Sequence, residues 1–66
     1  MQTREKVGER LRELRGDRSR EEIAIQVGVT AQAISNYECG IRSPSDVIKC
    51  KLAECFGKSV QEIFFD

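Results

Sequence analysis

Residues 19–38 read SREEIAIQVGVTAQAISNYE, and they carry the clearest structural pattern in the chain. Ser19 can accept a hydrogen bond from the first turn of a helix while Glu22, three residues later, returns one, which is the capping-box pattern. Gly28 supplies the permissive backbone that a helix end requires, and Thr30 is a second N-cap candidate. The stretch therefore predicts a short helix, a turn and another short helix, which is helix-turn-helix organisation.

Side-chain size and periodicity within this stretch indicate how the two short helices pack. Ala24 is small enough to let them cross closely, and Gly28 accepts a turn conformation that is costly for residues with a Cβ atom. Val29, Ile34 and Tyr37 are expected to anchor the second helix from its inner side. The residues on its opposite face are Gln32, Ser35 and Asn36.

Three further helices are predicted around this pair. One covers about residues 4–15, one follows a Ser45 cap, and a short final one follows Ser59, which forms a second capping box with Glu62. Their apolar positions at helical spacing are Val7, Leu11 and Leu14, then Ile48, Leu52 and Phe56, then Val60, Ile63, Phe64 and Phe65. With no strand signal, we expect one compact all-α domain of five helices over residues 1–66.

Composition excludes several classes of protein. The chain has 66 residues, three cysteines and no histidine. The cysteines form no CxxC pair, so we expect reduced thiols, no metal site and no cofactor, with a redox role for Cys50 or Cys55 left open. No Gly-rich phosphate loop or nucleophile motif points to an enzyme. The start of the chain lacks an apolar stretch for a signal peptide or membrane span, which predicts a cytoplasmic protein.

Charge is balanced in total but uneven along the chain. Lys plus Arg and Asp plus Glu number 11 each. Residues 1–20 carry seven basic and four acidic side chains, a net +3, and residues 21–66 carry the opposite −3. Since non-specific affinity for nucleic acid comes mainly from phosphate neutralisation, any DNA binding should depend on shape and base contacts.

Three stretches in this order, GERLRELR, SREEIAIQVGVTAQAISNYECGIRSPS and KLAECFGKSVQEIF, closely resemble the lambda-repressor-like, Cro-type (XRE-type) helix-turn-helix family. The resemblance covers nearly the whole chain. It implies a five-helix DNA-binding domain in which the second helix crosses the DNA backbone and the third, about Thr30–Glu38, enters the major groove. It further implies a small prokaryotic or phage transcription regulator that binds double-stranded DNA, most simply as a repressor.

The resemblance also implies which residues contact DNA. Gln32 and Asn36 can bond adenine and the alanines can pack on thymine methyl groups, so an A·T-leaning half-site is expected. The implied base-reading residues are Ala31, Gln32, Ala33 and Asn36, and the implied phosphate-binding residues are Arg20, Thr30, Arg42 and Ser43. Arg20 stands where the family commonly has glutamine. The resemblance also implies that Glu38 pairs with an arginine of the first helix, and Arg15 is the candidate.

Two features depart from the family pattern. The connection GDRS between the first two helices is about two residues shorter than usual, and Arg18 replaces the customary apolar residue before the cap. The hydrophobic staple at this helix start is thereby lost. This departure leaves the placement of the first helix open.

A domain of this size reads few base pairs, so a homodimer on a palindromic operator is expected, with half-sites about one turn apart. Phe64 and Phe65 are the expected interface, with Phe65 folding back over the core as the alternative. The competing function is a protein-interaction module, such as an antitoxin, that uses Ile25, Phe64 and Phe65 as its docking surface.

Overall fold

The computed structural model describes residues 3–65; residues 1, 2 and 66 of the predicted domain lie outside this range. Its helical elements are α1 (Arg4–Arg15), α2 (Arg20–Val27), α3 (Ala31–Glu38), α4 (Asp46–Phe56) and η1 (Gln61–Phe65). The described residues contain no strand, so the prediction of an all-α domain with five helical elements is confirmed. α3 ends at Glu38, as the resemblance implied for the third helix.

Hydroxyl side chains begin the helices, as the sequence predicts. Ser19 Oγ accepts from the Glu22 amide at 3.1 Å, and Thr30 Oγ1 accepts from the Ala33 amide at 3.0 Å. Such caps satisfy backbone N–H groups that have no partner within the helix. Among the described residues the reciprocal bond of a capping box forms only at Ser59, whose N–H donates to Glu62 Oε1 at 3.0 Å.

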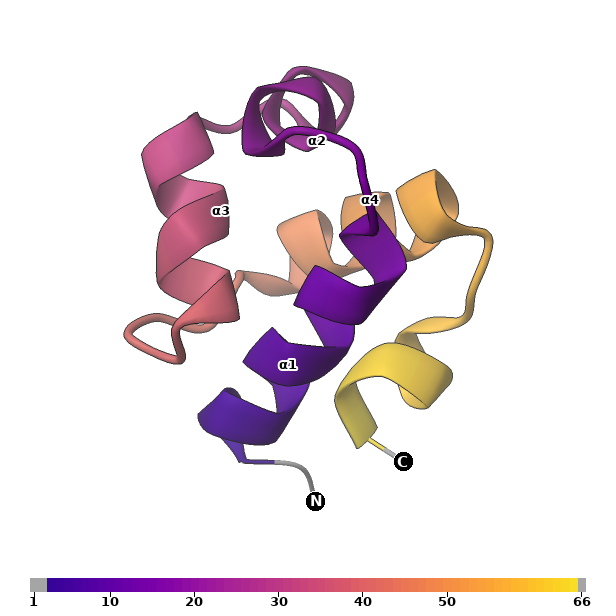
Figure 1. Ribbon diagram of the computed structural model, residues 1–66. Coiled ribbons are helices and arrows are strands. Elements are labelled where there is room, and N and C mark those ends of the chain that lie inside the picture. Colours follow the sequence, from indigo (N-terminus) through magenta and orange to yellow (C-terminus); the bar gives the residue numbers. More distant parts are fainter. Residues whose placement is uncertain (1–2, 66) are drawn as a thin grey trace.

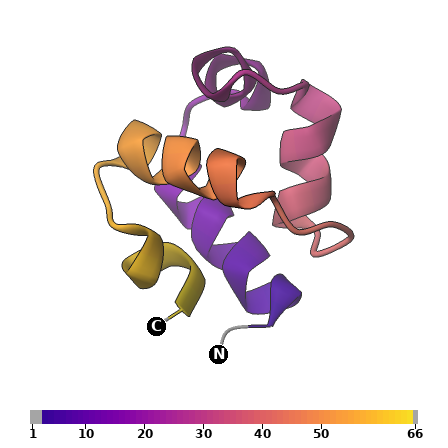
Figure 2. The ribbon, with the colours of Figure 1, turned by 180° about the vertical axis from the view of Figure 1, so that it is seen from behind.

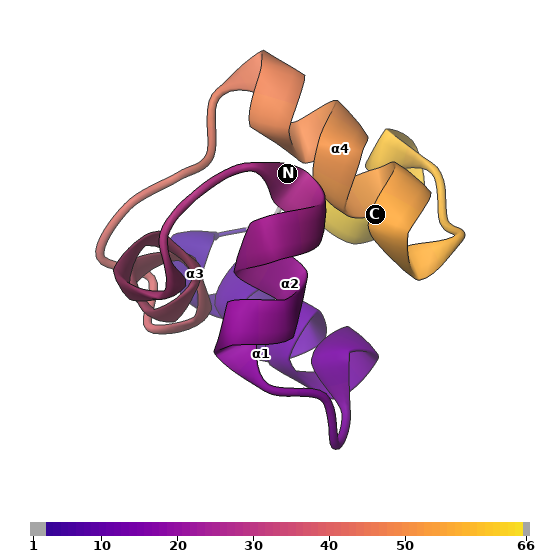
Figure 3. The ribbon, with the colours of Figure 1, turned by 90° about the horizontal axis from the view of Figure 1, so that it is seen from above.

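The helices are arranged so that α3 lies at one edge of the molecule. In Figure 1, α2 is seen nearly end-on and α3 from the side. In Figure 3, α3 is seen nearly end-on and α2 from the side, so the two helices cross steeply. Figure 2 shows α4 passing over α1, with η1 beside both. No other helix covers the outer side of α3 in these views, so that side is free to contact a ligand.

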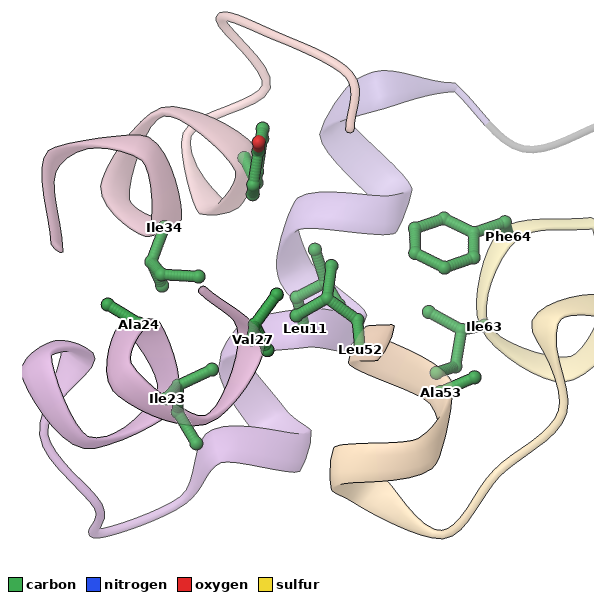
Figure 4. Close-up of a cluster of buried hydrophobic side chains, with 10 residues drawn as sticks. Leu11, Ile23, Ala24, Val27, Ile34, Leu52, Ala53, Ile63 and Phe64 are labelled. Atoms are coloured by element: carbon green, nitrogen blue, oxygen red, sulfur yellow. The ribbon is translucent and has the colours of Figure 1, made fainter. Parts of the chain in front are cut away.

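The core gathers side chains from every element (Figure 4). Its buried members are Leu11, Ile23, Ala24, Val27, Ile34, Tyr37, Leu52, Ala53, Ile63 and Phe64. In a chain of this size most of the stabilising free energy must come from this single cluster. Val7, Leu14, Val29, Ile48, Phe56 and Val60, all expected on inner faces, pack around it half-buried.

The last element differs from the ordinary helix that the sequence predicts. η1 is a π-helical turn. Its consecutive residues Ile63 and Phe64 both face the core, at 0% and 4% exposure. Arg10 of α1 donates through Nη1 to the carbonyls of Glu62 and Ile63, which fastens the turn to α1.

Arg18 compensates for the apolar residue that it replaces. Its guanidinium donates to the carbonyls of Leu14 at 2.9 Å and Arg15 at 3.3 Å, at the end of α1. The same group lies over the Phe56 ring, 5.3 Å from the centroid, as in a cation–π contact. The short connection between α1 and α2 is therefore attached to both α1 and α4, which fixes the placement of the first helix that the sequence left open.

α1 and α3 approach each other closely at Gly8. A Cβ atom built on Gly8 would lie 2.2 Å from the Glu38 carbonyl oxygen and 2.8 Å from that of Tyr37. Both atoms belong to the backbone, so neither can rotate away. Only glycine at position 8 lets the end of α3 rest directly on α1.

We expect Gly8→Ala to destabilise the domain even though alanine favours helix formation over glycine by about 1 kcal/mol. The backbone clash should lower the free energy of unfolding by about 1–3 kcal/mol, as overpacking does. Urea denaturation followed by circular dichroism measures this change. Glu9→Ala, at the exposed neighbouring position, is the matched control. A Gly8→Ala protein as stable as the control would contradict the close approach.

Candidate nucleic-acid interface

A tight turn sets the angle between α2 and α3. Gly28 has φ 84°, in the left-handed region that favours glycine, and its N–H donates to the Ala24 carbonyl at 2.8 Å. The Val29 N–H shares that carbonyl at 3.0 Å. Ala24 and Ile34, the residues expected at the crossing of these helices, are both buried.

The outer side of α3 carries an ordered pair of amides. Gln32 is exposed and Asn36 is half-buried, one turn apart. Gln32 Nε2 donates to Asn36 Oδ1 at 3.0 Å. This bond leaves the Gln32 carbonyl oxygen as an acceptor and the Asn36 NH₂ group as a donor. The pair thus presents both kinds of group that base recognition in the major groove requires.

The residues next to this pair on α3 differ in what their side chains contact. Ala31 and Ser35 are half-buried, and both line a hollow between the starts of α2 and α3. Ala33, which the resemblance placed among the base-reading residues, is half-buried and packs against the core. Ser35 was expected to face outward but was not assigned a role, although its one-turn spacing from Gln32 is the signal that could have found it.

Glu38 is buried at the end of α3 and is held by two arginines. Its side chain is 3% exposed. Arg15 Nε donates to Oε2 at 2.6 Å and Nη2 to Oε1 at 3.1 Å, so the pair that the family resemblance implied is present. The hydrogen bond to Glu38 raises the pKa of Arg15 above its usual value, while burial lowers it. Arg20 Nε also donates to Glu38 Oε1, at 3.1 Å.

The loop after α3 is fixed in place beside α1. The N–H groups of Ile41 and Arg42 donate to the Asn36 carbonyl at 3.0 and 3.3 Å. Arg4 Nη1 donates to the Ile41 carbonyl at 3.2 Å. Gly40 has φ 75° and sits against the backbone of α1, where a Cβ atom would lie 3.2 Å from the Glu5 nitrogen. Arg42 and Ser43 are exposed, and they lie on a loop that these hydrogen bonds hold in place.

The predicted phosphate-binding residues therefore flank the outer side of α3. Arg20 and Thr30 stand at the starts of α2 and α3, and Arg42 and Ser43 follow the end of α3. A polar ligand longer than α3 could contact the amide pair and both groups together. This arrangement suits an extended polyanion with readable edges better than a small molecule.

Phe64 and Phe65 are separated by the structure. Phe64 is part of the core, which corrects the expectation that both aromatic side chains form an outer surface. Phe65 is 44% exposed, with Lys49 Nζ 5.3 Å from its ring centroid. Only Phe65 of the two is available to a partner.

Other kinds of site find little support in residues 3–65. They contain no group of three or more His, Cys, Asp or Glu side chains placed to hold a metal ion. None of their helices is long and apolar enough to cross a membrane. Cys39, Cys50 and Cys55 are free thiols, and Cys55 donates to Gln26 Oε1 at 2.9 Å.

Comparison with known proteins agrees with this geometry. The family model described as Helix-turn-helix matches residues 9–63. No curated protein sequence matches the chain. The restriction-modification controller protein C.AhdI from Aeromonas hydrophila is 35% identical over 92% of this chain and 96% of its own, with a TM-score of 0.84. The clp gene regulator ClgR from Corynebacterium glutamicum is 26% identical over 96% of this chain and 69% of its own, also with a TM-score of 0.84.

The family match covers most of the chain, and the solved relatives have the same fold. Members of this family are regulators and not enzymes. The chain belongs to the Cro-type (XRE-type) helix-turn-helix family of DNA-binding transcription regulators.

Proposed function

We propose that this protein is a sequence-specific repressor that binds a palindromic, A·T-leaning operator as a homodimer in the cytoplasm. The observation that carries the proposal is the Gln32–Asn36 amide pair of α3, in which Gln32 is exposed and Asn36 is half-buried. α3 would lie in the major groove, with α2 across the backbone. The similarity to a restriction-modification controller makes the promoters of such genes the first operators to test.

Each proposed contact has a stated chemistry. Gln32 and Asn36 would bond adenine edges, and Ala31 would pack against a thymine methyl group. Ala33 contributes by packing the helix against the core. The residues proposed to bind phosphate are Arg20, Thr30, Arg42 and Ser43. Because the net charge is zero, non-specific binding should be weak, and discrimination between sequences should rest on the base contacts.

A protein-docking function has one specific observation in its favour. Ile25 on α2 is 82% exposed, beside the acidic residues Glu21 and Glu22. An exposed apolar side chain by itself is common and needs no function. The docking function therefore stands second, and it predicts no dependence on the amide pair.

Selection of bound duplexes from a random DNA pool should enrich an A·T-leaning palindrome. Gln32→Ala and Asn36→Ala should each weaken binding to that palindrome by about 1–3 kcal/mol per base contact, measured by fluorescence anisotropy. Gln26→Ala removes an exposed amide from α2 and should bind like the parent protein. If the two α3 variants bind like Gln26→Ala, base reading by this pair is wrong; if no duplex is enriched even at low salt, DNA reading itself fails.

Phe65→Ser should raise the dimer dissociation constant about tenfold or more, because aromatic anchors dominate small interfaces. Sedimentation equilibrium over a concentration series measures this constant. Ile25→Ser removes a more exposed apolar side chain from α2 and should leave the dimer unchanged. A dimer weakened by Ile25→Ser and not by Phe65→Ser would move the interface to α2.

A further inference from the structure

The two arginines that hold Glu38 use their donors differently. Arg15 is almost fully engaged: Nε and Nη2 bond Glu38, and Nη1 donates to the Arg18 carbonyl at 2.8 Å. Its side chain is only 14% exposed. Arg15 and Glu38 therefore neutralise each other inside the domain and offer little to an external ligand.

The side chain of Arg20 makes a single hydrogen bond among the described residues, from Nε to Glu38 Oε1 at 3.1 Å. Its side chain is 41% exposed, and its terminal Nη1 and Nη2 groups have no partner within residues 3–65. One anchored nitrogen restricts the rotation of the guanidinium plane while two nitrogens stay free. Two free NH₂ groups in one plane of restricted rotation match the geometry of bidentate phosphate binding.

The surroundings of Arg20 place this group beside the candidate reading surface. Arg20 lines a hollow of about 420 Å³ between the starts of α2 and α3, together with Ser19, Gln32 and Ser35. Glu21 lines the same hollow and opposes an anion there. Arg15 also lines the hollow and interacts electrostatically with Glu21, but its donors are taken by Glu38 and the Arg18 carbonyl. Arg20 is therefore the cation in the hollow whose terminal groups remain open to a phosphate.

We propose that Glu38 is a positioning residue for DNA binding: through Nε it holds Arg20 so that the two terminal nitrogens point at a backbone phosphate next to the bases read by Gln32. The inference rests on the proposed DNA-binding function. A side chain held in advance loses less conformational entropy on binding than a free one. A buried carboxylate therefore strengthens the binding of a polyanion, opposite to the effect expected from its charge alone.

Three variants test this arrangement on the duplex selected for the parent protein, with dissociation constants measured over a range of salt concentrations. Arg20→Met should weaken binding at least about tenfold per half-site, since a bidentate contact loses two charge-assisted hydrogen bonds and even one is worth about that factor. It should also reduce the slope of log K against log salt by about 0.9 per half-site, since one phosphate is no longer neutralised. Arg20→Lys should keep the slope but still lose affinity, because one ammonium cannot bond Glu38 and a phosphate in the same way. Glu38→Gln should weaken binding although the protein becomes more positive.

Lys58→Met is the matched control, since it removes one positive charge at the turn between α4 and η1, on the side away from α3 (Figure 1). It should leave the salt slope unchanged, and thermal unfolding should show each variant folded at the assay temperature. If Arg20→Met lowers the melting temperature without changing the slope, or if Arg20→Lys binds like the parent, the inference is wrong. Tighter binding by folded Glu38→Gln would also overturn it. If the parent itself selects no duplex, the proposed function fails instead.

Discussion

The contact between α1 and α3 at Gly8 is the constraint on which the candidate nucleic-acid interface depends. α3 has only eight residues, and a helix of that length is not stable alone in water. It keeps its shape because α1 supports its inner side and end. The missing side chain at Gly8 lets the two backbones touch, and this closeness brings Arg15 within reach of Glu38. The loop carrying Arg42 then leaves α3 in a fixed direction.

Sequence patterns predicted most of the fold because its elements are locally encoded. The hydroxyl caps at Ser19, Thr30, Ser45 and Ser59 can be recognised from one helical turn of sequence each, and all four form. The π-helical turn could not be predicted this way. Its residues Ile63 and Phe64 are buried in a core that distant elements build, and no local pattern marks that environment. The effect of Arg18 likewise depends on Phe56, 38 positions further along the chain.

The site was predicted less completely than the fold. Family resemblance pointed to Gln32, but its bond to Asn36 and the packing of half-buried Ala33 against the core are seen only in the folded structure. The resemblance implied that Arg20 binds phosphate, but it did not pair Arg20 with Glu38. The bond of Arg20 to Glu38 crosses 18 positions, and no local pattern marks it. Contacts between side chains on different short helices leave no local pattern in a single sequence, so they could not be predicted from it.

The position of η1 bears on how the domain forms during synthesis. The segments that carry the candidate contacts with DNA, from α2 to the loop after α3, are complete by residue 43. The core that supports them still lacks Ile63 and Phe64, and Arg10 has no η1 carbonyls to bond until that turn exists. Domains generally fold as units once their core residues are available. A ribosome must therefore release the segment through η1 before α3 gains its final support.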